Sequence, residues 1–448
     1  MKTKSLLPFI LALLIAGTLS GCNNLDNRGH ITDYFNTAHP ASPSPTGSRS
    51  AVAIEIYHCK TEFKDALEKA ANKFMSEHDN VIVKTKYTDD MQNYSQTVRT
   101  MINSGQGPDI FNLMGPSDTD ELLDKLADLT DMKVIQHVLK RYTKCVTVED
   151  KIYGVPCSIE GYGLIYNKEI FEKAKIDVRE IDSYDAFVKA VMEIDQMKEQ
   201  LKLEAVFAFP AKDTRNTGEY MSSIFLSAEF NGDSQKAYHE KNLEFKYAEA
   251  FKQMVDLQNK YSIQPSKDID AEKQAEYFAK GKVAIIQQSN WILPILNKID
   301  SEFASSKIDI MSYPIPGIDR NFNVLGANDY WGINNASVHE EVETAKDFIN
   351  WLYLSEEGLA VLTKEYKLLP AIKGISADYG EDPITRYIIT YAASEDTNVC
   401  IYMGYPKNWG TNVLGESIRQ YVGGRLSWDD VVKNAKAAWE KARKEQSQ

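Results

Sequence analysis

Short apolar strands alternate with amphipathic helices from residue 51 onward, and this order constrains the fold of the 448-residue chain more than any other feature. Val52 to His58 alternates apolar and polar residues, which is the pattern of a half-buried strand. The next segment, from Phe63 to Phe74, carries apolar residues at helical spacing. A strand over 81–87, a helix over 92–104 and a strand over 109–114 follow. This βαβαβ order predicts a parallel sheet with right-handed crossovers.

The same alternation continues toward the C-terminus, so the chain is predicted to be α/β throughout. Hydrophobic residues make up 43% and charged residues 26% of the sequence, which is ordinary for a globular protein. The length exceeds what one hydrophobic core usually holds and is natural for two lobes. Further strands are predicted at 164–166, 205–209 and 283–287, and further helices at 168–175, 183–202, 243–261, 270–280, 339–354 and 427–444.

The first 22 residues have the features of an export signal. Lys2 and Lys4 supply a positive start, and the apolar run from Leu6 to Leu19 is too short for a comfortable membrane span. The ending Leu19-Ser20-Gly21-Cys22 resembles the bacterial lipobox, in which the cysteine is diacylated and becomes the mature N-terminus. We therefore predict a signal peptide over residues 1–21 and a lipid anchor at Cys22. An ordinary signal peptide that ends near a cysteine is the alternative.

Residues 22–50 form a polar segment that ends in a stretch rich in serine and proline. Such a composition cannot bury enough apolar surface to order itself, so a flexible tether is predicted. With the lipid anchor, this tether would hold the folded body on the extracytoplasmic face of the cell membrane. The formal net charge of −13 argues against nucleic acid and anionic lipid headgroups as partners.

Cysteine usage and sequence motifs point to no metal, cofactor or catalytic centre. The four cysteines beyond Cys22 are scattered, without a C-x-x-C pair or metal-site spacing. Export permits disulfides, and the sequence does not decide between a pairing and buried free thiols. No nucleophile elbow, zinc-protease motif, P-loop or dinucleotide fingerprint is present, so we expect no enzyme; a glycosidase with two carboxylates is the alternative. The four cysteines are Cys59, Cys145, Cys157 and Cys400.

Four local patterns follow one another along the chain. The first is Gly107-Pro108-Asp109-Ile110-Phe111, and the second joins Ile152-Tyr153-Gly154-Val155-Pro156 to Gly163-Leu164-Ile165-Tyr166-Asn167-Lys168. The third is Phe278-Ala279-Lys280-Gly281-Lys282-Val283-Ala284, with Trp291 shortly after, and the fourth is Tyr330-Trp331-Gly332-Ile333 followed by a helix. Each pattern is weak alone. In this order, behind a lipobox, they resemble the extracellular solute-binding proteins of ABC importers (family 1), the sugar binders related to maltose-binding protein.

The resemblance covers essentially residues 51–445 and implies the type II periplasmic-binding-protein-like fold. In this fold two α/β lobes, each a mostly parallel sheet flanked by helices, are joined by crossing hinge strands, and the ligand lies in the cleft between them. It predicts an N-terminal lobe of residues 51–157 plus 287–328 and a C-terminal lobe of residues 159–285 plus 330–448. The crossings are expected near 158–161, 286–289 and 328–330.

A sugar offers hydroxyls at its rim and apolar C–H faces, so its site needs aromatic platforms and planar polar groups. Candidates are residues that the predicted elements place beside a crossing or at the carboxyl end of a strand. For each, a structural role in the core, in helix packing or in a turn is the alternative. The segment Gln287-Gln288-Ser289-Asn290 departs from the glycine that many relatives carry before the tryptophan. The candidates are Trp291, Trp331, Tyr330, Glu160, Tyr162, Asn112, Trp409 and His58.

The resemblance implies a tethered, monomeric binding protein that captures a carbohydrate and delivers it to an ABC permease without doing chemistry. The extended, aromatic-lined clefts common among these relatives favour an oligosaccharide over a monosaccharide. A polyamine, an anion, ferric iron or a peptide remains an open alternative. For iron, Tyr402 and Tyr405 would be the clustered tyrosines.

Replacing the lipobox cysteine tests the anchor directly. The variant Cys22→Ala cannot be diacylated, so we expect the protein to leave the membrane fraction and appear in the soluble extracytoplasmic fraction. Fractionation followed by immunoblotting measures this, with Cys59→Ala as the matched control. Retention of the Cys22→Ala variant in the membrane fraction would contradict the prediction.

Overall fold

A computed structural model describes residues 51–448 except 91–92, 319–320, 366–367, 377–378 and 447–448. The predicted signal peptide, Cys22 and the predicted tether therefore lie outside the described residues. Within the described ranges, every helix is too short or too polar to cross a membrane.

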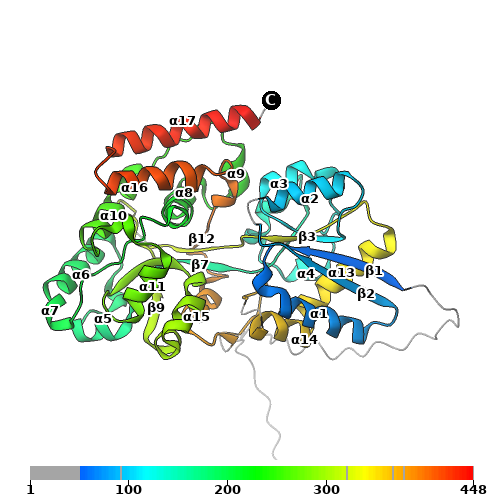
Figure 1. The fold of residues 1–448 in the computed structure, drawn as a ribbon, viewed down its shortest axis with the longest axis horizontal. Helices are drawn as coiled ribbons and strands as arrows, with labels where there is room; N and C mark the ends of the chain where they lie inside the picture. Colours follow the sequence, from blue (N-terminus) through cyan, green and yellow to red (C-terminus); the bar gives the residue numbers. More distant parts are fainter. Residues whose placement is uncertain (1–50, 91–92, 319–320, 366–367, 377–378, 447–448) are drawn as a thin grey trace, which may run out of the picture. The chain divides into compact units, whose positions relative to one another are not determined.

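The first sheet has the strand order β2-β1-β3-β11-β6 (Figure 1). Strand β1 runs parallel to both β2 and β3, which confirms the predicted βαβαβ unit. Strand β11 lies between β3 and β6 and is antiparallel to both. The alternating pattern of β1 puts Ile54 and Ile56 in the core, as the sequence predicts. The bounds are β1 (Val52–His58), β2 (Val81–Tyr87), β3 (Ile110–Leu113), β6 (Val155–Pro156) and β11 (Tyr330–Ile333).

The second sheet has the order β12-β10-β7-β8, and β9 also pairs with β7. Among the described strands of this sheet, β10 and β12 are parallel, whereas β7 is antiparallel to β8, β9 and β10. The predicted mostly parallel sheet is therefore wrong for this lobe. This follows from the path of the chain. Strand β7 carries the chain away from the first sheet and β10 carries it back, so the two strands run in opposite directions. The bounds are β7 (Glu160–Asn167), β8 (Ile285–Ser289), β9 (Ile308–Met311), β10 (Asn323–Gly326) and β12 (Thr397–Val399).

Helices from two distant parts of the sequence surround the first sheet (Figure 1). Phe74 of α1 packs edge-on against Phe348 of α13, with ring centroids 5.2 Å apart. The helix predicted over 339–354 is confirmed to the residue. A short hairpin, β4 (Thr147–Val148) and β5 (Lys151–Ile152), lies before β6. The helices are η2 (Thr61–Phe63), α1 (Lys64–Glu77), α2 (Tyr94–Asn103), α3 (Pro116–Glu121), η3 (Leu123–Lys125), α4 (Lys133–His137), η4 (Lys140–Tyr142), η5 (Lys144–Val146), α13 (His339–Leu354), α14 (Glu356–Ala360) and η11 (Val361–Glu365).

The second sheet carries the larger set of helices. The helix predicted over 183–202 is two helices, α6 and α7, and the strand predicted over 205–209 is reduced to isolated bridges at Phe207. The other predicted helices of this part are confirmed within a few residues. The helices described in this part, predicted or not, are α5 (Lys168–Ala174), η6 (Val178–Glu180), α6 (Tyr184–Gln196), α7 (Lys198–Leu201), η7 (Asn216–Met221), α8 (Ser222–Phe230), α9 (Ser234–His239), α10 (Ala248–Lys260), η8 (Ser266–Asp268), α11 (Ala271–Ala279), η9 (Asn290–Ile292), α12 (Leu293–Ile299), η10 (Phe303–Lys307), α15 (Pro383–Tyr391), η13 (Tyr402–Gly404), η14 (Trp409–Gly415), α16 (Glu416–Val422) and α17 (Trp428–Gln446).

The chain passes between the sheets at residues 157–159, from β6 to β7, and at residues 327–329, from β10 to β11. Both positions agree with predicted crossings. A third passage joins η11 to α15, and there the Ile159 N–H donates to the Leu369 carbonyl at 2.7 Å. The crossing predicted near 286–289 is wrong, because β8 pairs with β7 inside the second sheet.

These pairings correct the predicted division of the chain. Segment 287–328 contains β9 and β10, which pair with β7, so it belongs with the second sheet. Residues 330–365 contain β11 and α13, which belong with the first sheet. We therefore define the N-terminal lobe as residues 51–156 plus 330–365, and the C-terminal lobe as residues 160–326 plus 383–448. Pairing between strands far apart in sequence decides this, and local periodicity does not report it.

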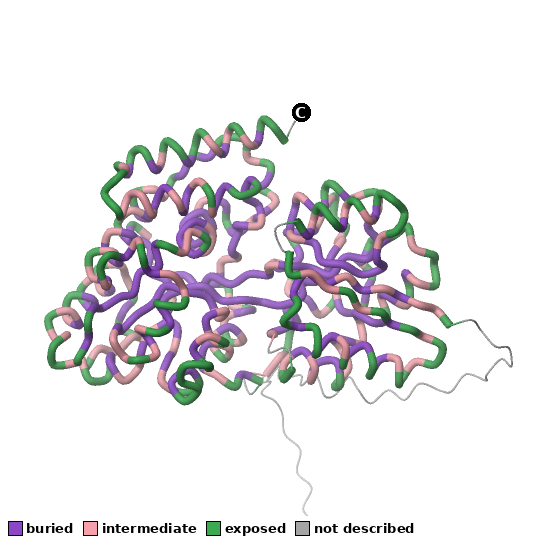
Figure 2. Tube along the Cα trace, in the orientation of Figure 1, coloured by how far each residue is buried: buried purple, intermediate pink, exposed green. Residues whose placement is uncertain are grey.

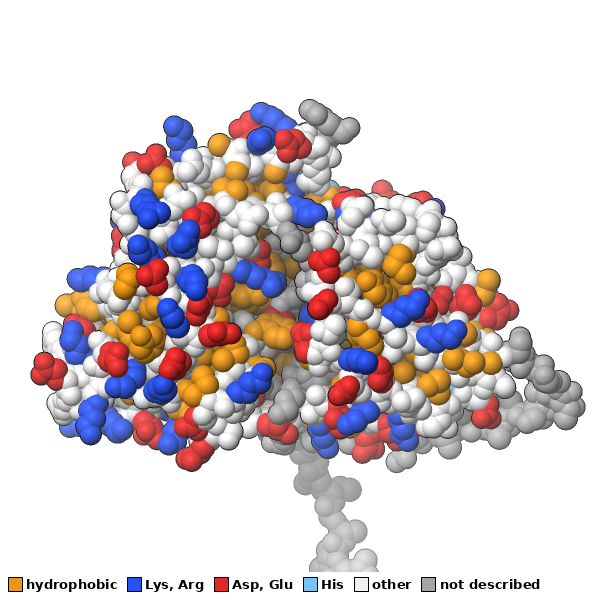
Figure 3. Space-filling view, viewed as in Figure 1, with side chains coloured by type: hydrophobic (Ala, Val, Ile, Leu, Met, Phe, Trp, Pro, Cys, Tyr) orange, Lys and Arg blue, Asp and Glu red, His pale blue; other side chains and the backbone are white. Residues whose placement is uncertain are grey.

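Burial follows the two sheets, whose strands are largely buried while the helices around them expose one face (Figure 2). On the face seen in Figure 3, basic and acidic side chains are interspersed over the helices. Among the described helices, many charged side chains form pairs at i,i+4 spacing, such as Lys73 with Glu77. Exposed pairs of this kind contribute little to stability, so the cores carry most of it.

Trp409 lies in the core of the C-terminal lobe, against α17. Its ring is perpendicular to that of Trp439, with centroids 4.9 Å apart, and its indole N–H donates to the Ala435 carbonyl at 2.8 Å. Trp409 is 2% exposed. The structure therefore gives this tryptophan a packing role.

Truncating this ring should destabilise the protein. Trp409→Ala removes a buried aromatic ring and leaves a cavity, so we expect the free energy of unfolding to fall by about 3–5 kcal/mol. Urea unfolding measures the loss. Trp351→Ala is the comparison variant: Trp351 is only partly buried on α13, although its ring contacts Phe74 and Phe348, so its loss should be clearly smaller than that of Trp409. Equal losses for the two variants would contradict the core assignment.

Candidate ligand-binding site

A cavity of about 320 Å³ lies between the two lobes. The N-terminal lobe contributes Phe63 and Thr363, and the C-terminal lobe contributes residues after β8, from α12 and from the start of α15. Described residues of the third passage complete the wall. The lining residues are Phe63, Glu160, Asn290, Trp291, Leu293, Pro294, Asn297, Ser305, Thr363, Leu368, Leu369, Tyr379, Glu381, Asp382 and Thr385.

Trp291 lines this cavity because of how β8 ends. The Ser289 hydroxyl accepts a hydrogen bond from the backbone N–H of Trp291 at 3.3 Å. This bond caps η9 and turns the chain directly after the strand. The partly buried indole ring lies 6.2 Å from the Phe63 ring, across the gap between the lobes. The Lys60 ammonium lies 5.1 Å from the centre of the indole. Trp291 and Phe63 thus form an aromatic wall shared by both lobes.

Glu160 begins β7 and also lines the cavity, although the residue is only 1% exposed. One carboxylate oxygen, Oε2, accepts hydrogen bonds from the Tyr162 hydroxyl at 2.8 Å and from the Asn328 amide. The other, Oε1, has no hydrogen-bond partner among the described residues. Burial raises the pKa of Glu160, although the charge of Lys60 opposes the rise. Glu160 therefore lies at the cavity with one shielded carboxylate oxygen, Oε1, that no hydrogen bond of standard geometry satisfies among the described residues.

Tyr162 belongs to a cluster of three tyrosines on the other side of Glu160. Its hydroxyl lies 3.3 Å from that of Tyr402, and its ring centroid lies 4.9 Å from that of Tyr220. The Arg215 guanidinium lies 5.4 Å from the centre of the Tyr220 ring. Tyr220 and Arg215 lie at η7, and sequence reasoning missed both because no local pattern marks them; Tyr402 was considered only as an iron ligand.

A buried ion pair stands behind the cavity. The Lys60 ammonium lies 3.1 Å from Asp329 Oδ1, with side chains 10% and 2% exposed. Burial acts against the charge of Lys60, but Asp329 and Glu160 outweigh it, so the pKa of the ammonium is raised. Asn112 accepts from the Cys59 N–H at 3.1 Å and donates to Asp329 Oδ2 at 3.4 Å. Asn112 thus lies within the polar network behind the cavity and not on its wall.

The remaining predicted residues support the site from behind or lie elsewhere. His58 Nδ1 accepts from the Lys60 N–H at 2.9 Å, and burial lowers the pKa of His58 to about 3. Its ring packs edge-on against Trp331 at 5.0 Å, and the Trp331 indole donates to the Tyr353 hydroxyl at 2.9 Å. Tyr330 is buried in a separate apolar cluster of the N-terminal lobe. Trp409 lies in the core of the C-terminal lobe, away from the lining residues.

The cysteines and carboxylates indicate no redox or metal centre in the described part of the chain. All four described cysteines are buried free thiols, which answers the question of pairing that the sequence left open. Burial raises the pKa of the Cys145 thiol to about 12, so it is protonated and unreactive at neutral pH. Among the described residues, no group of His, Cys, Asp or Glu side chains could hold a metal ion.

The family model described as "Bacterial extracellular solute-binding protein" matches residues 69–388. A relative named multiple sugar-binding protein, from Streptococcus mutans, is 22% identical over 381 residues, which is 80% of this chain and 85% of the relative. These two matches agree with the resemblance derived from the sequence patterns.

Solved structures give the same result for the fold. The apo form of RafE from Streptococcus pneumoniae superposes with a TM-score of 0.73 at 18% identity, over 89% of this chain and 99% of RafE. A Bacillus licheniformis sugar transporter protein, solved in complex with stachyose, gives a TM-score of 0.60 at 17% identity, over 87% of this chain and all of that one. The predicted two-lobe α/β fold is confirmed. Because the family model covers most of the folded part, the chain belongs to the bacterial extracellular solute-binding protein family.

Proposed function

We propose that this protein captures an oligosaccharide in the cavity between its lobes and delivers it to an ABC permease. The single observation that carries the proposal is the wall made by Trp291 and Phe63 beside the unpartnered Oε1 of Glu160. An aromatic face suits the C–H face of a sugar ring, and a buried acceptor suits a hydroxyl. Sugar binding by the similar proteins from Streptococcus mutans and Bacillus licheniformis supports the same class of ligand.

Capture would work by closing the two lobes on the ligand. The crossings at 157–159 and 327–329 are short, and cavity walls come from both lobes, so rotation about the crossings changes the gap between Phe63 and Trp291. A ligand that contacts both walls stabilises the closed arrangement, which is the state that a permease would recognise. A sugar without the matching hydroxyls would leave buried acceptors unpaired and bind more weakly.

Delivery would take place at the outer face of the membrane, with the lipid at Cys22 as anchor and residues 22–50 as tether. In this proposal the protein does not alter the sugar chemically. It works as a monomer. Incubation of the purified protein with the bound sugar should return it intact, as chromatography of the products would show. Hydrolysis that is lost on mutation of Glu160 would instead favour a glycosidase.

Thermal unfolding with a panel of solutes tests the ligand class. A bound ligand raises the unfolding temperature, and the rise grows with its concentration. We expect such a rise for a series of oligosaccharides, and a smaller one for the corresponding monosaccharides. Spermidine, ferric citrate and short peptides complete the panel, and a rise confined to one of them would overturn the proposal.

Two tryptophans separate a binding role from a packing role. Trp291→Ala removes an aromatic wall, so we expect ligand binding to weaken by about 1–3 kcal/mol with little change in stability. Trp331→Phe breaks the hydrogen bond to Tyr353 in the core, so it should lower the free energy of unfolding by about 1 kcal/mol and leave affinity nearly unchanged. Calorimetric titration and urea unfolding of both variants measure this. A loss of stability with unchanged affinity in Trp291→Ala would instead give Trp291 a packing role.

A further inference from the structure

The side chain of Lys60 contacts three parts of the structure at once. Its ammonium donates to Asp329 Oδ1 at 3.1 Å, in the crossing at 327–329. The ammonium also lies 5.7 Å from the centre of the Phe63 ring in the N-terminal lobe and 5.1 Å from the centre of the Trp291 ring in the C-terminal lobe. A buried cation thus lies between the two lobes, beside a segment that joins them.

Hydrogen bonds hold this ion pair from the side of the first sheet. The Lys60 N–H donates to His58 Nδ1 at 2.9 Å, which fixes the backbone at the end of β1. Asn112 of β3 donates to the other carboxylate oxygen of Asp329, Oδ2, at 3.4 Å. Both partners of the pair are therefore held by strands of the N-terminal lobe.

Glu160, the first residue of β7, faces the same ammonium from the C-terminal lobe. Burial raises the pKa of Glu160; the charge of Lys60 and a hydrogen bond from the Trp291 side chain oppose the rise, whereas the charge of Asp329 adds to it. Asp329 and Glu160 in turn act together to raise the pKa of the ammonium. Two buried carboxylates, one in a crossing and one in the C-terminal lobe, therefore share one cation.

The other titratable groups around the ammonium and Glu160 are uncharged near neutral pH. Burial raises the pKa of the Cys59 and Cys157 thiols and of the Tyr162 hydroxyl well above their usual ranges. Burial also lowers the pKa of His58 to about 3. Between about pH 5 and pH 8, the described groups of this network that can carry charge are therefore the ammonium and the two carboxylates.

We propose that Lys60 is a positioning residue that couples the two lobes: from its anchor on Asp329, the ammonium holds Glu160 and the Trp291 ring of the C-terminal lobe against the N-terminal lobe. Without this charge, two buried carboxylates would face each other with no cation between them, which forces them apart or makes one of them take up a proton. The inference goes beyond the proposed function, because it concerns the protein before any ligand binds.

Lys60→Met tests the role of the charge, because methionine keeps an unbranched apolar side chain. In this variant the pKa of the buried carboxyls in the folded protein rises further above its value in the unfolded chain, so protonation stabilises the fold at acidic pH and this contribution is lost as the pH rises. We expect the drop in unfolding temperature caused by Lys60→Met to be at least twice as large at about pH 8 as at about pH 5. A drop of the same size at both pH values would show that only packing is lost, and would overturn the proposal.

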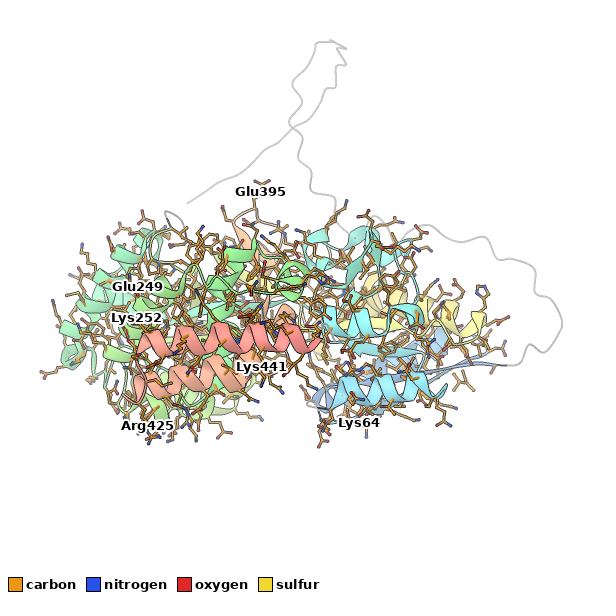
Figure 4. The ribbon with its side chains drawn as sticks, turned by 90° about the horizontal axis from the view of Figure 1, so that it is seen from above. Lys64, Glu249, Lys252, Glu395, Arg425 and Lys441 are labelled. Carbon is orange, nitrogen blue, oxygen red and sulfur yellow. The ribbon has the colours of Figure 1, made fainter. Side chains whose placement is uncertain are left out.

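Lys64→Met is the matched control. Lys64 is exposed at the start of α1, at the surface of the protein (Figure 4), and its ammonium lies 3.9 Å from the Glu68 carboxylate. Exposed ion pairs contribute little to stability, so the same substitution at this position should change the unfolding temperature little, and equally at both pH values.

A second substitution tests the partner in the C-terminal lobe. Glu160→Gln in the Lys60→Met background removes one of the two carboxylates without a cation, so it should restore at least half of the drop in unfolding temperature at about pH 8. If Lys60→Met alone gives no folded protein, recovery of folded protein in the double variant is the equivalent supporting result. A double variant that recovers neither stability nor folding would confine Lys60 to its pair with Asp329, and the coupling of the lobes would be wrong.

Acrylamide quenching of fluorescence measures the position of Trp291 without a ligand. Subtracting the emission of Trp291→Phe isolates the emission of this indole, and the same subtraction is made in the Lys60→Met and Lys64→Met backgrounds. We expect the isolated emission to be quenched at least twofold more strongly in the Lys60→Met background, because the ring loses the cation beside it and the Glu160 carboxylate that it contacts shifts. Equal quenching with and without Lys60 would overturn the positioning of Trp291.

Discussion

The ion pair between Lys60 and Asp329 is the interaction on which the site depends. Lys60 follows β1 and Asp329 lies in the crossing that leads to β11, so the pair ties the end of a central strand to the hinge. Burying two charges costs about as much as their attraction returns, so the main effect of such a pair is on position. Around it, Asn112 holds Asp329 from β3, and the Lys60 N–H donates to His58. The same ammonium lies beside Trp291, which connects this network to the cavity wall.

Much of the fold could be predicted where local sequence decides it. The strands at 52–58 and 81–87 and the helix at 339–354 were predicted correctly because their apolar residues repeat at the period of one element. The division into lobes was wrong because it depends on pairing between distant strands. Nothing in the sequence of residues 323–326 shows that this strand, β10, pairs with β7. Nothing in residues 330–333 shows that β11 pairs with β3. The antiparallel direction of β7 escaped prediction for the same reason.

The residues of the candidate site likewise fall into a group that local sequence could indicate and a group that it could not. Trp291 and Glu160 line the cavity, and both could be singled out from the sequence because they lie beside predicted crossings: Trp291 follows β8 and Glu160 begins β7. Lys60, Asp329 and Tyr220 could not, since tertiary packing brings them together. Trp409 shows the opposite error: an aromatic residue after a loop can turn inward, and here it packs against Trp439.

The unusual segment before Trp291 also has a structural explanation. The Gln287 carbonyl, near an edge of the second sheet, accepts from Asn216 at 3.2 Å and from Gln274 at 3.4 Å. Side-chain amides thus replace the neighbouring strand that would otherwise satisfy this edge.

The position of β11 has a consequence for how the chain acquires its structure. This strand lies between β3 and β6, yet more than 170 residues, including most of the C-terminal lobe, separate it from β6 in the sequence. Until residues 330–333 arrive, β3 and β6 each keep an open edge, and the first sheet stays incomplete. Contacts so distant in sequence form slowly. When the chain becomes available from its N-terminus, the first sheet therefore stays unfinished until about three quarters of the sequence is present, and the cavity between the lobes is among the last features to form.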